Sequence, residues 1–509
     1  MISYLIPNKN EIVALFSLIF LVFTFYSNGY LISKKKDFNI NFVVGWSLFS
    51  FVFILFGAIL KIKLNYIIHF YTISSLLIII KNFKFYRFIG LKKYFFLIPI
   101  FFLFLNSKSH GWDSFAFILD RTIYLLNNNE FPISQFRSNY PFSSTLIHYY
   151  SNFYTKNFTE NIPALFDLIL IIGSIEIFYK LLSNNYKLSF SNLIIILCIL
   201  IFFNPMIMNV YSFSSYEDLH VAYIILVIFY FNFENDFDLN KLLHKKNTYI
   251  MLIGLLSISK ATGFIHSGSI LLSNFLIFII FNNLDFRTFK NFIFLCFASF
   301  FQFFLWQYYL LINDIFVGNS FKGFRLEIFK NIIVNYYNQF LVKKLLIFSN
   351  FIFMFAPLFT YWVFKDNKIN KMLIFISIPV FIWNFFHLIF FIFIQGYSNA
   401  IGFHNFFRYL SQFSLVFTAI YIIIFVSNIK PTIILIFKNF AFGLFLKIIF
   451  FVVFFLNFYD FRRDLSDEYK VIKTIHESKK VLLYNNKNYN QLDKVILNFY
   501  TKNKGILFK

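Results

Sequence analysis

Two acidic segments lie where long apolar runs of the sequence end or begin. One is residues 110–114 (HGWDS) and the other is residues 216–218 (YED). A carboxylate at such a position can take the proton of a hydroxyl group as that hydroxyl attacks another atom. Asp113, Glu217 and Asp218 are therefore the candidate catalytic residues. Each could instead cap a helix or interact with its positive end, because acids are common at both places.

Basic residues occupy similar positions later in the chain. Arg408, with His404 before it and Tyr409 after it, stands at the start of an apolar run, and Lys260 separates two short runs. A guanidinium at a helix N-terminus is unfavourable for the helix dipole, so an anionic ligand such as phosphate explains Arg408 better. Lys260 is a second candidate cation, although its side chain could equally extend to lipid headgroups. These four residues are predicted to bind substrate.

A further polar group follows the first acidic segment. Tyr140 and Pro141 come soon after Arg137, and the proline fixes the start of a helix. We expect this helix, which carries His148, to lie along the membrane surface with its aromatic side in lipid. Arg137 and Tyr140 complete the candidate substrate-binding residues.

The elements that must position these residues are membrane spans. The chain has 509 residues, of which 59% are hydrophobic, 24% aromatic and 14% charged, whereas a soluble domain carries about 25% charged residues. This composition excludes a water-soluble enzyme and a secreted disulfide scaffold. The net charge of +23 does not indicate nucleic-acid binding, because the basic residues lie in short loops and form no continuous face. Membrane lipids are the expected surroundings.

The apolar runs predict an all-α polytopic protein with about 14 transmembrane helices, since roughly 20 apolar residues cross the hydrocarbon core. Basic residues fall on alternate connections, which orients the spans because Lys and Arg in short loops stay cytoplasmic. All the candidate site residues then share the extracytoplasmic face. The predicted spans are 12–32, 40–60, 64–80, 94–106, 162–180, 188–209, 218–233, 248–259, 264–281, 291–313, 345–364, 372–395, 409–427 and 431–457.

Three regions follow from this arrangement. Residues 1–92 are an extra N-terminal transmembrane module, and residues 93–457 are a transmembrane catalytic core. The core contains an outer loop, residues 107–161, in which two helices are expected. Residues 458–509 form a small polar tail, and the alternation of sides puts this tail outside the cytoplasm.

Carboxylates and cations at the outer face suit sugar transfer. The acceptor hydroxyl needs a base, and a lipid phosphate leaving group needs Arg or Lys to hold its charge. An activated sugar outside the cytoplasm must arrive on a lipid, because nucleotides are absent there. The residues predict no cofactor with certainty, although a divalent metal is compatible with this chemistry. The predicted location is the inner (plasma) membrane.

In the order of its features the chain resembles the bacterial membrane glycosyltransferases of the GT-C fold, which include aminoarabinose transferase and protein O-mannosyltransferase. The resemblance covers about residues 93–428 and consists of Trp112-Asp113, the two-helix outer loop with Tyr140-Pro141, Glu217-Asp218, Ser259-Lys260 and Arg408-Tyr409. It implies that Asp113 is the base or orients the acceptor, with Glu217 or Asp218 as its partner. It also implies that Lys260 and Arg408 hold the phosphate of a polyprenyl-phosphate donor. In the family, one span usually precedes the first outer loop, whereas four precede it here.

Three other functions stay open at this point. An O-antigen polymerase or ligase would also use lipid-linked glycans and would depend on arginines in a late outer loop. Residues 314–344, with Lys322, Arg325 and Lys330, could supply such a loop. A lipid-oligosaccharide flippase or other transporter would carry polar residues near the bilayer midplane and broken helices in paired halves. A membrane scaffold without catalytic activity is the fourth interpretation.

Overall fold

A computed structural model describes most of the chain. It describes residues 7–503 apart from 83–96, 112, 134–139, 156, 184–196, 199, 203, 205, 207–212, 214–215, 283–284, 316–324, 333, 335–343, 364–366, 395–405, 428–439, 466–469 and 479–490. Every regular element in the described residues is a helix, and there is no strand among them. The predicted all-α architecture is confirmed for this part of the chain.

Several of the helices are long and apolar enough to cross a membrane. Among the described residues there are 6 such helices, or up to 7 if the bent pair α14–α15 forms one span. The 6 are Lys9–Ser33, Phe38–Ile59, Leu64–Lys81, Ile162–Leu182, Gly263–Phe281 and Asn367–Ile394. The protein is therefore a membrane protein by the length and composition of its helices. The larger number of about 14 spans stays a prediction.

The chain folds as two compact units. Unit 1 comprises residues 1–202, 209–220 and 428–509, and unit 2 comprises residues 203–208 and 221–427. The helices of unit 1 are α2 (Lys9–Ser33), α3 (Phe38–Val52), η1 (Phe53–Ile59), α4 (Leu64–Asn82), α5 (Ile98–Phe104), η4 (Ser114–Ile118), α6 (Leu119–Asn128), α7 (Ser143–Phe153), α8 (Ile162–Ser183), α23 (Phe440–Leu456), α24 (Phe458–Phe461), η8 (Arg463–Leu465), α25 (Lys470–Ser478) and α26 (Gln491–Lys502).

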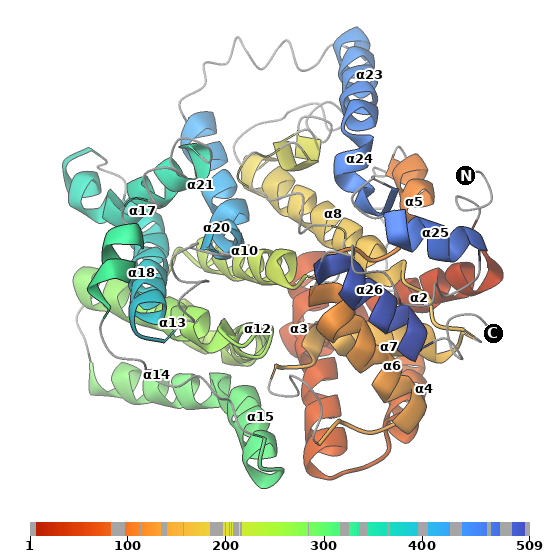
Figure 1. Cartoon of the computed structure of the whole chain (residues 1–509). Coiled ribbons are helices and arrows are strands. Elements are labelled where there is room, and N and C mark those ends of the chain that lie inside the picture. Colours follow the sequence, from red (N-terminus) through yellow and green to blue (C-terminus); the bar gives the residue numbers. More distant parts are fainter. Residues whose placement is uncertain are drawn as a thin grey trace. The chain divides into compact units, whose positions relative to one another are not determined.

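Unit 2 begins within the first turn of α10 (Asp218–Glu234). Its other helices are α11 (Leu239–His244), α12 (Lys246–Ser257), α13 (Gly263–Phe281), α14 (Phe286–Ser299), α15 (Phe301–Ile312), α17 (Lys344–Val363), α18 (Asn367–Ile389), η6 (Phe390–Ile394), α20 (Phe406–Leu410), η7 (Ser411–Phe413) and α21 (Ser414–Ser427). Helix α18 packs between α13 and α17, as Figure 1 shows.

The N-terminal helices of unit 1 pack closely against one another. A Cβ atom on Gly29 would lie 1.8 Å from the backbone oxygen of Asn41, and one on Gly45 would lie 1.8 Å from that of Phe25. The two glycines therefore let the backbones of α2 and α3 approach each other. Helix α2 also packs against α4, α7 and α8. Residues 1–92 are thus part of one compact unit with the outer loop, while their proposed role as a separate module stays a prediction.

The predicted outer loop contains two helical segments, as expected, but one of them is buried. The first is η4 followed by α6, and the second is α7. Every residue of α7 from Ser143 to Asn152 is buried, and α7 packs against α2, α6 and α8. The prediction that the aromatic side of this helix faces lipid is wrong, because that side packs against protein.

The C-terminal tail packs onto the same loop. An apolar cluster joins Phe115, Leu119, Ile123 and Phe158 of the loop with Ile472, Ile475, Ile496, Leu497, Phe499 and Tyr500 of the tail. Figure 1 shows α26 (dark blue) beside α6 (orange). The Tyr500 hydroxyl donates to Glu160 Oε1 over 2.8 Å. The tail and the loop therefore pack together within unit 1, while the side of the membrane on which they lie stays a prediction.

Buried ions connect the tail to residues 103–108. The guanidinium of Arg462 donates to both carboxylate oxygens of Asp464, over 2.8 and 2.9 Å, and Asp464 accepts the backbone N–H of Lys108 over 3.0 Å. Arg462 also donates to the backbone oxygen of Leu103. Both ionic side chains are 1% exposed. A paired, bidentate geometry is the one in which such buried charges are tolerated.

Contacts between connecting segments agree with the predicted sides within each unit. In unit 1, Lys180 Nζ lies 2.7 Å from Asp37 Oδ2, which joins two segments predicted to be cytoplasmic. In unit 2, Lys368 Nζ lies 2.9 Å from Asp236 Oδ1, again between two segments predicted to be cytoplasmic. Neither ion pair joins segments that were predicted to lie on opposite sides.

Candidate functional site

The two acidic segments of the sequence meet in unit 1. The backbone N–H of Asp113 donates to the Tyr216 hydroxyl in a long hydrogen bond of 3.4 Å. Asp113 is partly exposed, whereas Glu217 and Asp218 are 6% and 3% exposed. Segments about a hundred residues apart in the chain thus come together through one tyrosine. The sequence analysis named both segments but gave Tyr216 no role.

A glycine makes this approach possible. Gly111 has φ +88°, and a Cβ atom there would lie 2.4 Å from Cε2 of the Tyr216 ring. Any other L-residue at this position would be strained in the backbone and would push the ring away. The side chain of Asp113 makes no capping hydrogen bond to η4. The interpretation of Asp113 as a helix cap therefore does not describe the structure.

Burial perturbs the histidine of the first acidic segment. His110 is 1% exposed, and burial lowers its pKa to about 4, although the charge of Asp464 acts in the opposite direction. The pKa of Asp464 itself lies below its ordinary value. Burial acts to raise that pKa, but the ion pair and hydrogen bonds with Arg462 outweigh burial. At neutral pH His110 is therefore neutral and Asp464 is charged.

The predicted cations meet in unit 2. Lys260 follows α12, and its Nζ lies 4.9 Å from the centroid of the Tyr409 ring. Cζ of Arg408 lies 5.7 Å from the same centroid. Lys260 is 6% exposed and Arg408 is 7% exposed. Two buried cations that share one aromatic ring are stabilised by cation–π attraction and form a local concentration of positive charge.

Aromatic and amide side chains fix the position of Tyr409. Trp383 Nε1 donates to the backbone oxygen of Tyr409 over 3.3 Å, and the His387 ring lies 5.0 Å from the Tyr409 ring. His266 lies 4.0 Å from Trp383 between ring centroids and forms a hydrogen bond of 2.8 Å with Gln412. His266 and His387 lie singly in apolar runs of the sequence, a pattern typical of packed core residues. They are buried, but His387 also borders the cationic group.

The remaining predicted site residues are distributed differently. Tyr140 lies in unit 1 with its ring centroid 5.7 Å from Cζ of Arg121, and Arg121 also lies 4.7 Å from the Phe142 ring. Arg137 and His404 lie outside the described residues.

Asp167 is an important residue that the sequence analysis missed. It lies in α8 with 0% exposure and forms a hydrogen bond of 3.1 Å with His220, just after the second acidic segment. The signal was present, because an acid inside the apolar run IPALFDLILIIG is expensive to bury and is usually functional.

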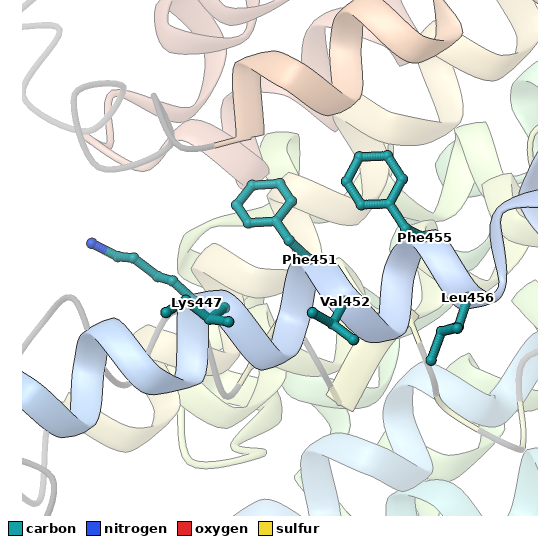
Figure 2. A pocket seen from close by; sticks show the side chains of 6 residues that line it. Lys447, Phe451, Val452, Phe455 and Leu456 are labelled. Atoms are coloured by element: carbon teal, nitrogen blue, oxygen red, sulfur yellow. The ribbon is translucent and has the colours of Figure 1, made fainter.

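A hollow on the surface of unit 1 involves none of these residues. It is lined by Lys447, Ile448, Phe451, Val452, Phe455 and Leu456, all from α23. Figure 2 shows Lys447, Phe451 and Phe455 projecting from one side of this helix. An apolar helix face of this kind suits contact with lipid chains. No group of three or more potential metal ligands occurs within the described part of the chain.

Comparison with known proteins adds no relative to this picture. No family model, no curated protein and no solved structure matched the chain. The site is therefore interpreted from its own geometry.

Proposed function

We propose that the protein is a membrane glycosyltransferase. It takes a sugar from a polyprenyl-phosphate donor and transfers it to a hydroxyl group of a lipid, glycan or protein acceptor. The reaction takes place at the extracytoplasmic face of the plasma membrane. The observation that carries this proposal is the meeting of Asp113 with the segment of Glu217 and Asp218 through Tyr216.

The acidic group supplies the base. As the acceptor oxygen attacks the anomeric carbon, its proton passes to a carboxylate. Asp113 is the candidate for this role because it is the partly exposed acid of the group, and an acceptor can reach it. Glu217 and Asp218 are more deeply buried. They act as its partners, by orienting the acceptor or by keeping negative charge near the developing positive charge of the sugar ring.

The cationic group binds the donor phosphate. When the glycosidic bond breaks, its electron pair stays with the phosphate oxygen, and the lipid phosphate leaves as an anion. Arg408 and Lys260 can stabilise this charge, and their burial makes the attraction stronger than in water. The aromatic surroundings of Tyr409 also suit a site entered from the lipid.

One observation weighs against the polymerase or ligase alternative. That alternative depends on a late outer loop with arginines available to substrate. Arg325 instead donates from Nε and Nη2 to the backbone oxygens of Ile392 and Phe391, over 2.9 and 3.0 Å. These hydrogen bonds tie the Arg325 guanidinium to the backbone of η6, so Arg325 has a structural role.

The proposal is tested with the purified protein in proteoliposomes. Radiolabelled polyprenyl-phosphate hexoses and pentoses are supplied with extracted cell-envelope material as acceptor, and the same sugars on nucleotides serve as the control. We expect incorporation from a lipid-linked sugar and none from a nucleotide sugar. Equal use of nucleotide sugars, or no incorporation from any lipid-linked sugar, would contradict the proposal.

A further inference from the structure

Asp167 contacts the chain both before and after the second acidic segment. Its Oδ2 accepts the backbone N–H of Phe213 over 2.7 Å, and its Oδ1 lies 3.1 Å from Nε2 of His220. Tyr216, Glu217 and Asp218 lie between these two points in the sequence. One carboxylate on α8 therefore holds the chain at Phe213 and at His220, on either side of the acids.

His220 is held from several directions. Its Nδ1 lies 3.0 Å from the hydroxyl oxygen of Ser144 on α7, while its Nε2 contacts Asp167. The ring also makes edge contacts with Trp46 and Phe166, at centroid distances of 5.7 and 5.1 Å. Ser144, Asp167 and His220 are each at most 1% exposed. No substrate reaches them, so the chain of contacts acts on the orientation of other groups.

The contact with Asp167 also stabilises an unfavourable backbone conformation at Phe213. Phe213 has φ +58°, in the left-handed region that a non-glycine residue rarely adopts. Such a conformation persists only where surrounding contacts impose it. The contacts are the hydrogen bond to Asp167 and the stacking of the Phe213 ring on Phe104 at 4.5 Å.

We propose that Asp167 and His220 are positioning residues for the acidic site. They hold Phe213 and residues 216–220 so that the Tyr216 hydroxyl stays against the backbone N–H of Asp113. This inference rests on the proposed function, because the purpose of the positioning is to place the acids for proton transfer. A buried carboxylate contributes little net stability, because its desolvation cost offsets its hydrogen bonds. Its geometric effect therefore explains its presence better than stability does.

The alternative is an ordinary polar contact that only helps α7 and α8 to pack against residues 216–220. The amide variant separates the two interpretations. In Asp167→Asn the side-chain oxygen can still accept from Phe213 while the NH₂ group donates to His220, whereas Asp167→Leu loses both bonds. Asn28→Leu is the matched control, because Asn28 is also buried in unit 1 but bonds to Tyr71 and Ser75.

The experiment combines hydrogen exchange with kinetics on the full chain in nanodiscs. In Asp167→Leu, amide exchange in the peptide that covers residues 213–220 should rise at least about tenfold, the loss expected from one hydrogen bond to a charged group. The kcat for transfer from a lipid-linked sugar should fall by a similar factor, while the donor KM stays unchanged. Asp167→Asn should restore both quantities to within about threefold. Asn28→Leu should leave exchange in residues 213–220 unchanged.

Each outcome decides between the interpretations. Unchanged exchange in Asp167→Leu overturns the positioning role whatever the activity. Raised exchange with an unchanged kcat, in a protein that loses activity on Asp113→Asn, overturns its link to catalysis. If exchange rises but no acid variant changes sugar transfer, the proposed function is wrong. The holding of residues 213–220 by Asp167 is then confirmed without a link to catalysis. Should Asp167→Leu not fold, Ser144→Ala and His220→Gln are measured in its place, and unchanged exchange in both overturns the proposal.

Discussion

The acidic group of unit 1 and the cationic group of unit 2 are held in different ways. Around the acids there are directional hydrogen bonds: Tyr216 accepts from the backbone N–H of Asp113, and Asp167 accepts from that of Phe213 and bonds to His220. The cations Lys260 and Arg408 both lie near the ring of Tyr409. The acidic group is thus positioned by hydrogen bonds with defined distances and angles. The cationic group lies close to a ring face.

The difference corresponds to what each group is proposed to do. Proton transfer requires a base within hydrogen-bond reach of one particular hydroxyl, so small displacements are costly. A phosphate has several equivalent oxygens, and a cation can stabilise it from a range of directions. A cation–π contact suits this purpose, because the attraction of a charge to a ring face depends less on exact angles than a hydrogen bond does. The predictions below test whether the two groups differ in this way.

A large effect is expected at Gly111. In Gly111→Ala, the added methyl group collides with Tyr216 and the positive φ becomes strained. A displacement of about 1 Å at a catalytic group can lower a rate roughly 100-fold, and we expect a loss of kcat of this size. Gly268→Ala is the control, because its Cβ would meet only Cζ of Phe300, at 3.7 Å. Equal losses in the two variants would show that the effect is not specific to the acidic group.

A smaller and different effect is expected at Arg408. Loss of its charge in Arg408→Ala should raise the donor KM about tenfold and leave the acceptor KM unchanged, as for one charge-assisted bond. Arg408→Lys should recover most of the affinity, because the site needs a charge rather than a fixed geometry. Arg287→Ala, at an exposed arginine, is the control for charge alone. If acceptor and donor use fall equally, Arg408 has a structural role.

The smallest effect concerns the stability of unit 1 against acid. His110 has a folded-state pKa of about 4 against an ordinary value of 6.5, because burial disfavours its charged form. The unfolded chain therefore binds more protons between these values, and stability that is complete above pH 6.5 falls as the pH drops towards 4. The lowered pKa of Asp464 adds a loss only below its ordinary value of 3.8.

Thermal unfolding at different pH values measures this effect. We expect the melting temperature to fall by a few degrees between pH 6.5 and pH 4.5. His110→Gln should flatten the curve in this range, since the titrating ring is gone. An unchanged slope in the variant would show that other groups are responsible for the acid sensitivity.

The sequence predicted the all-α architecture well, because long apolar runs favour membrane-spanning helices. Asp113, Asp218 and Arg408 stay predicted site residues, chosen because hydropathy marks the ends of spans. The sequence did not predict that α7 is buried in protein. Lipid and the protein interior are both apolar, so an aromatic helix suits either. The contact of Gly111 with Tyr216 depends on a backbone angle and a long-range approach, and neither has a local pattern.

The most direct test of the account is the rate of sugar transfer by Asp113→Asn. The amide has nearly the same shape as the carboxylate but cannot take the proton of the acceptor. The account predicts normal expression, unchanged binding of the polyprenyl-phosphate sugar, and a fall in transfer rate of about 100-fold or more, within the range attributed to a general base. Transfer at the rate of the unaltered protein would contradict it.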